Sequence, residues 1–155
     1  MPTSVKAFSP GHISGYFSKV VGETPEGTGS IGAGIVLSEG VTATVERSDE
    51  TEVVVVADGI ETIGSPPIEE VLERMKVQVL VRTESHLPMG SGFGLSAASL
   101  LAAITAADEL FSLSMGMPKI ARCAHEIEVL HGNVLGDVAA ELGGGLVCRS
   151  SPGIN

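Results

Sequence analysis

The sequence contains no tryptophan, one tyrosine and four phenylalanines, so aromatic side chains make up only 3 % of its 155 residues. The core must therefore be built from aliphatic side chains, and hydrophobic residues are plentiful at 43 %. A chain of this length can bury one sizeable core and is short for two. We expect a single domain of the ordinary globular class.

Positive charge is also scarce, because nine Lys and Arg residues face 19 Asp and Glu residues, for a formal net charge of −10 at pH 7. This balance argues against nucleic acid or an anionic membrane surface as a partner. It does not exclude a small anionic ligand, since backbone amides and a bound metal ion can supply positive potential locally.

Long hydrophobic runs and paired cysteines are absent from the sequence. The longest apolar window, residues 95–107, is too short to span a bilayer and runs directly into Asp108 and Glu109. Cys123 and Cys148 lie far apart and outside any CxxC spacing. The first residues include no apolar segment typical of a secretory signal. We therefore expect a soluble, cytoplasmic domain with no membrane partner.

The hydrophobic pattern predicts several strands in the first half and mainly helices in the second, which favours an α+β fold. Gly11 and the pair Glu39-Gly40 are read as turns that end strands, and residues 22–34 as a glycine-rich loop. Strands are expected at 3–8, 34–38, 41–46, 52–57, 76–84 and 146–149, and helices at 68–75, 96–111, 118–131 and 137–142.

Two glycine-rich segments are candidate ligand loops. Residues 27–32 match GxGxxG literally, but a dinucleotide fingerprint needs a strand before it and a helix after it. Here the preceding residues are GETPE and the following AGIVL is typical of a strand. A flexible loop over a ligand, or a plain connection, explains this segment better.

The second segment, PMGSGFGLSAA at 88–98, follows a predicted strand and opens a predicted helix. It lacks the GxxxxGK[ST] pattern of a Walker loop. Alternating glycines can turn backbone N–H groups inward, and a helix start carries about half a positive charge, so the segment could bind phosphate. Ser96 could then contribute its hydroxyl to a metal ion. A tight strand-to-helix turn explains the glycines equally well.

The predicted helix 118–131 carries a flank formed by Ala121, His125 and Glu128, at a spacing of four and three residues. A histidine and a carboxylate beside a small residue suit the wall of a cleft, although the pattern alone favours a surface Glu–His pair. His131 falls on the apolar face and is expected in the core.

The segment 88–98 resembles the phosphate-binding motif of the GHMP kinases, P-x-x-x-G-L-G-S-S-A-A. Residues 8–13, FSPGHI, are similar to the APGK-type motif near the start of that family. Residues 29–34 (GSIGAG), 124–129 (AHEIEV) and 135–138 (LGDV) resemble archaeal pantoate kinases in particular. The resemblance spans residues 5–150. Leu95 departs from the family pattern by replacing a serine, and His12 by replacing a lysine.

This resemblance implies the N-terminal, ATP-binding domain of a GHMP kinase over residues 1–150, with a mixed or antiparallel sheet packed against helices. Residues 151–155 would begin a linker to a C-terminal domain that is absent from this chain. The implied activity is phosphorylation of the 4-hydroxyl of pantoate in coenzyme A biosynthesis, with ATP and Mg²⁺. The alternatives are a homoserine-, mevalonate- or shikimate-type kinase and a catalytically incomplete fragment that binds nucleotide. A homodimer is possible.

The resemblance also implies site residues. Ser96 and Glu128 would hold Mg²⁺, and Asp137, together with Glu128, would be catalytic, with Asp137 addressing the acceptor hydroxyl. Without the family match, Asp137 is explained as a helix cap. The implied substrate contacts are His12, Ser30, His125 and Arg149, of which His125 could instead hold Glu128 and Arg149 could be a surface charge. The implied nucleotide contacts are Pro88, Gly90, Ser91, Gly92, Gly94, Leu95, Ser96 and Ala97.

Overall fold

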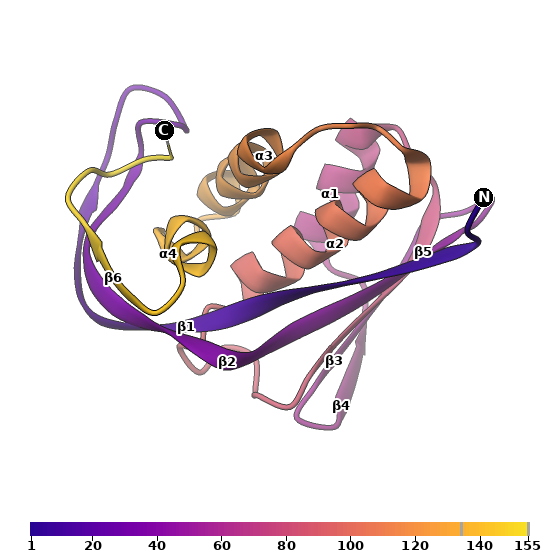
Figure 1. Ribbon diagram of the computed structural model, residues 1–155, viewed down its shortest axis with the longest axis horizontal. Helices are drawn as coiled ribbons and strands as arrows, with labels where there is room; N and C mark the ends of the chain where they lie inside the picture. Colours follow the sequence, from indigo (N-terminus) through magenta and orange to yellow (C-terminus); the bar gives the residue numbers. More distant parts are fainter. Residues whose placement is uncertain (134, 155) are drawn as a thin grey trace.

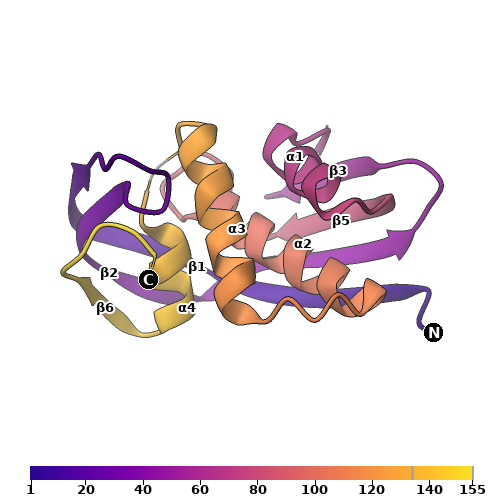
Figure 2. The same ribbon diagram turned by 90° about the horizontal axis from the view of Figure 1, so that it is seen from above.

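The computed structural model describes residues 1–133 and 135–154. One mixed sheet has the strand order β1-β2-β5-β3-β4, and β6 pairs with β2. Helices gather on one face of this sheet, and Figure 2 shows α1, α2 and α3 side by side above it (Figures 1 and 2). The expected α+β class is therefore confirmed. The strands are β1 (Ser4–Val20), β2 (Gly29–Arg47), β3 (Glu52–Ala57), β4 (Ile60–Ile63), β5 (Val79–Ser85) and β6 (Leu146–Arg149). The helices are α1 (Pro66–Met75), α2 (Leu95–Phe111), α3 (Met117–Leu130) and α4 (Asp137–Gly143).

The two longest strands, β1 and β2, correct the sequence prediction, because neither ends at its expected turn. Pro10 lies opposite Gly40 in their antiparallel ladder, and the register shifts between Pro10 and His12. Proline is tolerated here because β1 is an edge strand. A Cβ atom at Gly40 would overlap the Ser9 carbonyl oxygen, so Gly40 permits close approach of the two strands. Of the expected loop at 22–34, residues from 29 onward are strand.

The core lies between the sheet and α2, the helix that contacts β1, β2, β5 and the other three helices. Six alanines in α2 keep the helix narrow enough for this central position. Val45 and Val81 of the sheet meet Leu100 and Ile104 of α2, all at most 1 % exposed. A helix enclosed on several sides is expected to be apolar all round, which explains the long hydrophobic window. None of the helices in the described residues is long and apolar enough to cross a membrane.

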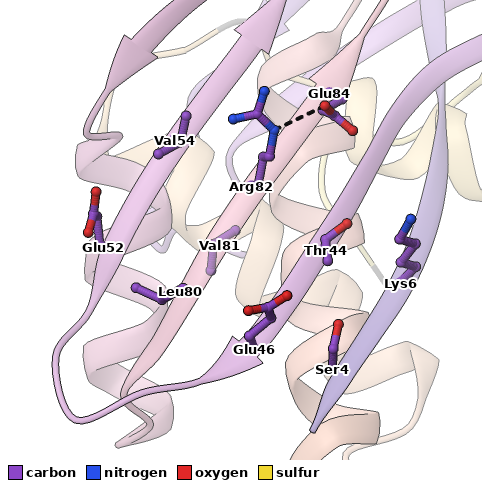
Figure 3. Close-up of a pocket in the computed structure, with 10 residues that line it drawn as sticks. All are labelled: Ser4, Lys6, Thr44, Glu46, Glu52, Val54, Leu80, Val81, Arg82 and Glu84. Atoms are coloured by element: carbon purple, nitrogen blue, oxygen red, sulfur yellow. Dashed lines mark hydrogen bonds and ion pairs between the residues drawn. The ribbon is translucent and has the colours of Figure 1, made fainter.

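The opposite face of the sheet is open and polar. Lys6, Thr44, Arg82 and Glu84 project from it around a shallow hollow (Figure 3). Arg82 lies 3.0 Å from Glu84 and 3.1 Å from Glu61, so its charge is matched on the sheet itself. Alternating buried and exposed residues along β5 are what a sheet with one solvated face requires.

Two further details differ from the sequence prediction. The strand β4, which pairs with β3 in a tight hairpin, was not expected. His131 lies just past the end of α3 rather than in the core, and its Nε2 is 2.6 Å from Glu70 Oε2. His131 is the C-cap residue, and its backbone has left the helical conformation (φ −85°, ψ 3°), so its side chain is no longer held on the apolar face of α3.

Candidate functional site

The loop between β5 and α2 follows a left-handed path at every second residue. Gly90, Gly92 and Gly94 have φ angles of 72°, 86° and 65°, which glycine adopts without steric cost. A Cβ atom on Gly90 or Gly92 would meet open space, whereas one on Gly94 would lie 2.6 Å from Glu141 Oε1. The alternating glycines are therefore required by the backbone, and the first two leave room for a ligand.

The N-terminus of α2 opens into a cavity of about 420 Å³. Gly94 is the N-cap residue, and no side chain among the described residues bonds to the first-turn amides. Free amides at a helix start bind anions, and the helix dipole adds to the attraction. The lining residues are Ser14, Phe17, Met89, Gly90, Gly92, Phe93, Gly94, Leu95, Ser96, Glu128, Asn133 and Asp137.

Ser96, Glu128 and Asn133 form a hydrogen-bonded group in this cavity. Ser96 Oγ donates to Glu128 Oε1 at 2.7 Å, and Asn133 Nδ2 donates to Glu128 Oε1 at 2.9 Å. Burial raises the pKa of the Glu128 carboxyl, and the two hydrogen bonds oppose that rise. Hydroxyl and carboxylate oxygens are the ligands that Mg²⁺ prefers. Within the described residues no three His, Cys, Asp or Glu side chains could hold a metal ion on their own, so further oxygen ligands would have to come from elsewhere.

Asp137 is the first residue of α4 and also lines the cavity. Its Oδ1 lies 2.7 Å from Nδ1 of His12, which is fully buried. The His12 ring is not among the residues that line the cavity and meets Asp137 instead.

Ser30 and Arg149 meet beside Gly136, the residue that precedes Asp137. Arg149 Nη2 donates to Ser30 Oγ at 3.2 Å, and Ser30 Oγ donates to the Leu135 carbonyl at 2.5 Å. A Cβ atom on Gly136 would lie 2.8 Å from the Arg149 guanidinium carbon, so glycine lets the arginine pack against the backbone at this position. Arg149 Nε and Nη1 are buried with no hydrogen-bond partner among the described residues. Both expected substrate residues therefore lie together at Gly136.

A second cavity of about 210 Å³ adjoins the first, and Phe17 and Asn133 line both. Ser30 and Lys19 contribute to its wall. A positive side chain and a hydroxyl in a small cavity suit a small anionic molecule.

His125 neither bonds to Glu128 nor lines the cavity. Its side chain is 2 % exposed, and its Nε2 lies 2.7 Å from the Thr28 carbonyl and 3.1 Å from the Pro25 carbonyl. It therefore holds the loop that joins β1 to β2 and does not bond to Glu128.

Among the expected nucleotide contacts, five lie in the cavity wall, while Pro88, Ser91 and Ala97 lie outside it. Leu95 is 4 % exposed and packs with Val41 and Ala98, so this departure from the family motif places an apolar side chain in the core and leaves only its backbone at the site.

Two residues of the site were missed in the sequence. Asn133 follows a turn after α3, where no local pattern distinguishes it from an ordinary loop residue. Glu141 lies one helical turn after Asp137, a spacing that puts both carboxyls on one face of α4 and that could have indicated it.

Comparison with known proteins finds relatives that are named as pantoate kinases. The sequence pattern of the GHMP kinases N terminal domain matches residues 65–145. The pantoate kinase of Methanospirillum hungatei is 46 % identical over 97 % of this chain and 54 % of the relative. The pantoate kinase of Thermococcus kodakarensis is 35 % identical over 96 % of this chain and 52 % of the relative. The chain thus spans about half the length of the curated relatives it matches.

A solved structure described as a phosphotransferase related to the CoA biosynthesis pathway superposes with a TM-score of 0.83 at 31 % identity. It covers 97 % of this chain and 54 % of that one. The family pattern covers more than half of the chain, including the glycine loop, α2, α3 and Asp137. The chain therefore belongs to the GHMP kinases and contains their N-terminal domain.

Proposed function

We propose that this chain is the nucleotide-binding half of an ATP- and Mg²⁺-dependent kinase that phosphorylates the 4-hydroxyl of pantoate. One observation carries the proposal: the uncapped start of α2, the Ser96–Glu128 pair, Asp137 and Ser30 line two adjoining cavities, and Arg149 donates a hydrogen bond to Ser30. Phosphoryl transfer depends on positioned phosphates, neutralised charge and an oriented acceptor, and these groups would together meet the three requirements.

The glycine loop and the first turn of α2 would hold the phosphates. Leu95 and Ser96 in the first turn of α2 line the cavity, and Gly90 and Gly92 leave space for close approach. Ser96 and Glu128 would hold Mg²⁺, which supplies positive charge to the transferring phosphoryl group when bound. Asn133 would keep the Glu128 carboxylate oriented through its 2.9 Å hydrogen bond.

Asp137 would orient the acceptor hydroxyl and take its proton. In this step the acceptor O–H bond breaks and the proton passes to the Asp137 carboxylate. The acceptor oxygen bonds to the γ-phosphorus as the bond to the ADP leaving group breaks.

Arg149, Ser30 and Lys19 would bind the carboxylate of the acceptor. Arg149 Nε and Nη1 are buried without partners among the described residues, and either of them, together with Nη2, would form the guanidinium edge that pairs with a carboxylate through two hydrogen bonds. Because Arg149 packs against Gly136, a carboxylate bound there would place a nearby hydroxyl beside Asp137. A small hydroxy acid such as pantoate fits this arrangement, as the names of the relatives suggest.

The test is a coupled assay of ADP release on a protein that joins this chain to a C-terminal half like that of the relatives, with pantoate, homoserine, mevalonate and shikimate as acceptors. We expect turnover with pantoate, and Arg149→Lys should raise KM for pantoate at least about tenfold while KM for ATP stays unchanged, because lysine cannot form the two-bonded pair. Turnover with homoserine or mevalonate but not pantoate would reject the substrate and keep the kinase. No turnover with any acceptor, in a protein that includes a C-terminal half like that of the relatives, would reject the activity.

A further inference from the structure

His12 joins two parts of the site that are distant in sequence. Its backbone N–H donates to the Phe93 carbonyl in the glycine loop at 2.8 Å, and its Nδ1 lies 2.7 Å from Asp137 Oδ1. The ring is 0 % exposed, so it acts on the cavity only through Asp137.

The partners of the two ring nitrogens assign the proton. A carboxylate oxygen accepts, so Nδ1 carries a hydrogen. His12 Nε2 is buried and lacks a hydrogen-bond partner in the part of the chain that the structure describes. A proton on that nitrogen would leave a charged ring with an unpaired buried N–H, whereas a lone pair costs less. These partners therefore assign a hydrogen to Nδ1 and a lone pair to Nε2.

The absence of a side chain at Gly34 leaves the space that the His12 ring occupies. A Cβ atom on Gly34 would overlap His12 Nε2 and the Ile13 carbonyl oxygen. The register shift between Pro10 and His12 occurs at the same point of β1. A bulge re-aims the side chain that follows it, and here the ring turns toward α4.

We propose that His12 is a positioning residue for Asp137, acting as a neutral Nδ1–H donor that fixes one carboxylate oxygen and leaves the other for the acceptor hydroxyl. This inference rests on the proposed function, since it assumes that Asp137 takes the hydroxyl proton. The imidazole keeps its own hydrogen throughout and relays no proton.

Two substitutions of His12 distinguish the roles of its two ring nitrogens. Asparagine places an amide N–H near the position of Nδ1, whereas glutamine places its amide near the position of Nε2. We expect His12→Asn to keep kcat within about tenfold of wild type and His12→Gln to lower it about 100-fold, since a misplacement of about 1 Å costs that much. KM for ATP should change little in both. Equal loss in the two variants would show that the whole ring, or its charge, is needed and would overturn the proposal.

A double variant tests whether His12 acts through Asp137. His12→Gln combined with Asp137→Asn should be no slower than Asp137→Asn alone, because residues that act through one another are not additive. Additive losses would overturn the positioning role.

Nitrogen-15 NMR of the histidine rings in the wild-type protein needs no activity and no variant of His12. At pH 7 we expect one protonated nitrogen on His12, with its N–H signal shifted by Asp137→Asn. A doubly protonated ring, or a signal indifferent to that substitution, would overturn the inference. Confirmed NMR signals in a protein that fails to phosphorylate pantoate would instead reject the proposed function alone.

Discussion

At the scale of single residues, Glu141 is a buried carboxyl that forms no hydrogen bond within the described part of the chain. It is 4 % exposed, and neither carboxyl oxygen has a hydrogen-bond partner among the described residues. Desolvation, followed by the negative charges of Asp137 and Glu128, raises the pKa of Glu141 well above its usual range. Three carboxyls crowd the start of α2, and Glu141 is the one best suited to remain protonated.

Stability should therefore depend on the ionisation of Glu141. A carboxyl whose folded pKa is raised favours the folded state at acidic pH, and that contribution is lost as pH rises through the folded pKa. Glu141→Gln keeps the shape without the ionisation, so its Tm relative to wild type should rise between pH 5 and pH 8, by several degrees for about 1–3 kcal/mol.

Thermal melts at several pH values give this measurement. The exposed Glu109→Gln is the matched control for losing one carboxylate from a strongly negative protein. A Tm difference between Glu141→Gln and wild type that stays constant with pH would contradict the prediction.

At the scale of elements, the start of α2 depends on the packing of α4 beneath it. Asp137 and Glu141, one turn apart on α4, both lie against Gly94, with Asp137 Cγ 3.2 Å and Glu141 Oε1 2.6 Å from a Cβ atom built there. Gly94 thus serves the left-handed turn and the contact with α4 at once. Ser96 from α2 and Glu128 from α3 meet at the same end of the helix, so three helices position the site.

Gly94→Ala should damage both stability and activity. The left-handed φ of 65° costs a non-glycine residue about 1–2 kcal/mol, and the added methyl group must also displace the two carboxyls. We expect a loss of kcat of at least about tenfold. Gly59→Ala, at a φ of 74° with open space around it, is the control for the backbone cost alone. Similar activities of the two variants would show that the contact of Gly94 with α4 does not matter.

At the scale of the whole molecule, the 155-residue chain contains the phosphate loop, the Ser96–Glu128 pair and its own core. We therefore expect it to bind ATP with Mg²⁺ in calorimetry, with heat that falls strongly when Ser96 is replaced by alanine, and to turn over pantoate slowly or not at all. Binding without turnover would agree with a site that the remaining half of the longer relatives completes. Absence of binding in a folded chain would show that the phosphate site itself needs further residues.

The sequence predicted the features that depend on neighbours along the chain. The α+β class, the long apolar helix, β3, β6 and the loop-to-helix junction follow from local periodicity and glycine spacing. Local reading failed where glycine and proline serve close approach, as at Gly40, because the same residues usually mark turns.

Contacts between distant segments were decided by the tertiary structure. His12 meets Asp137 across 125 positions, Arg149 meets Ser30 across 119, and His125 meets Thr28 across 97. Composition and periodicity determined which elements form and which carry chemistry. The sequence did not show that His12 and His125 are buried; this was decided by the bend of β1 and β2 and by the packing of the helices. The direction of a side chain depends on the register and bulges of its strand and on the packing of its helix.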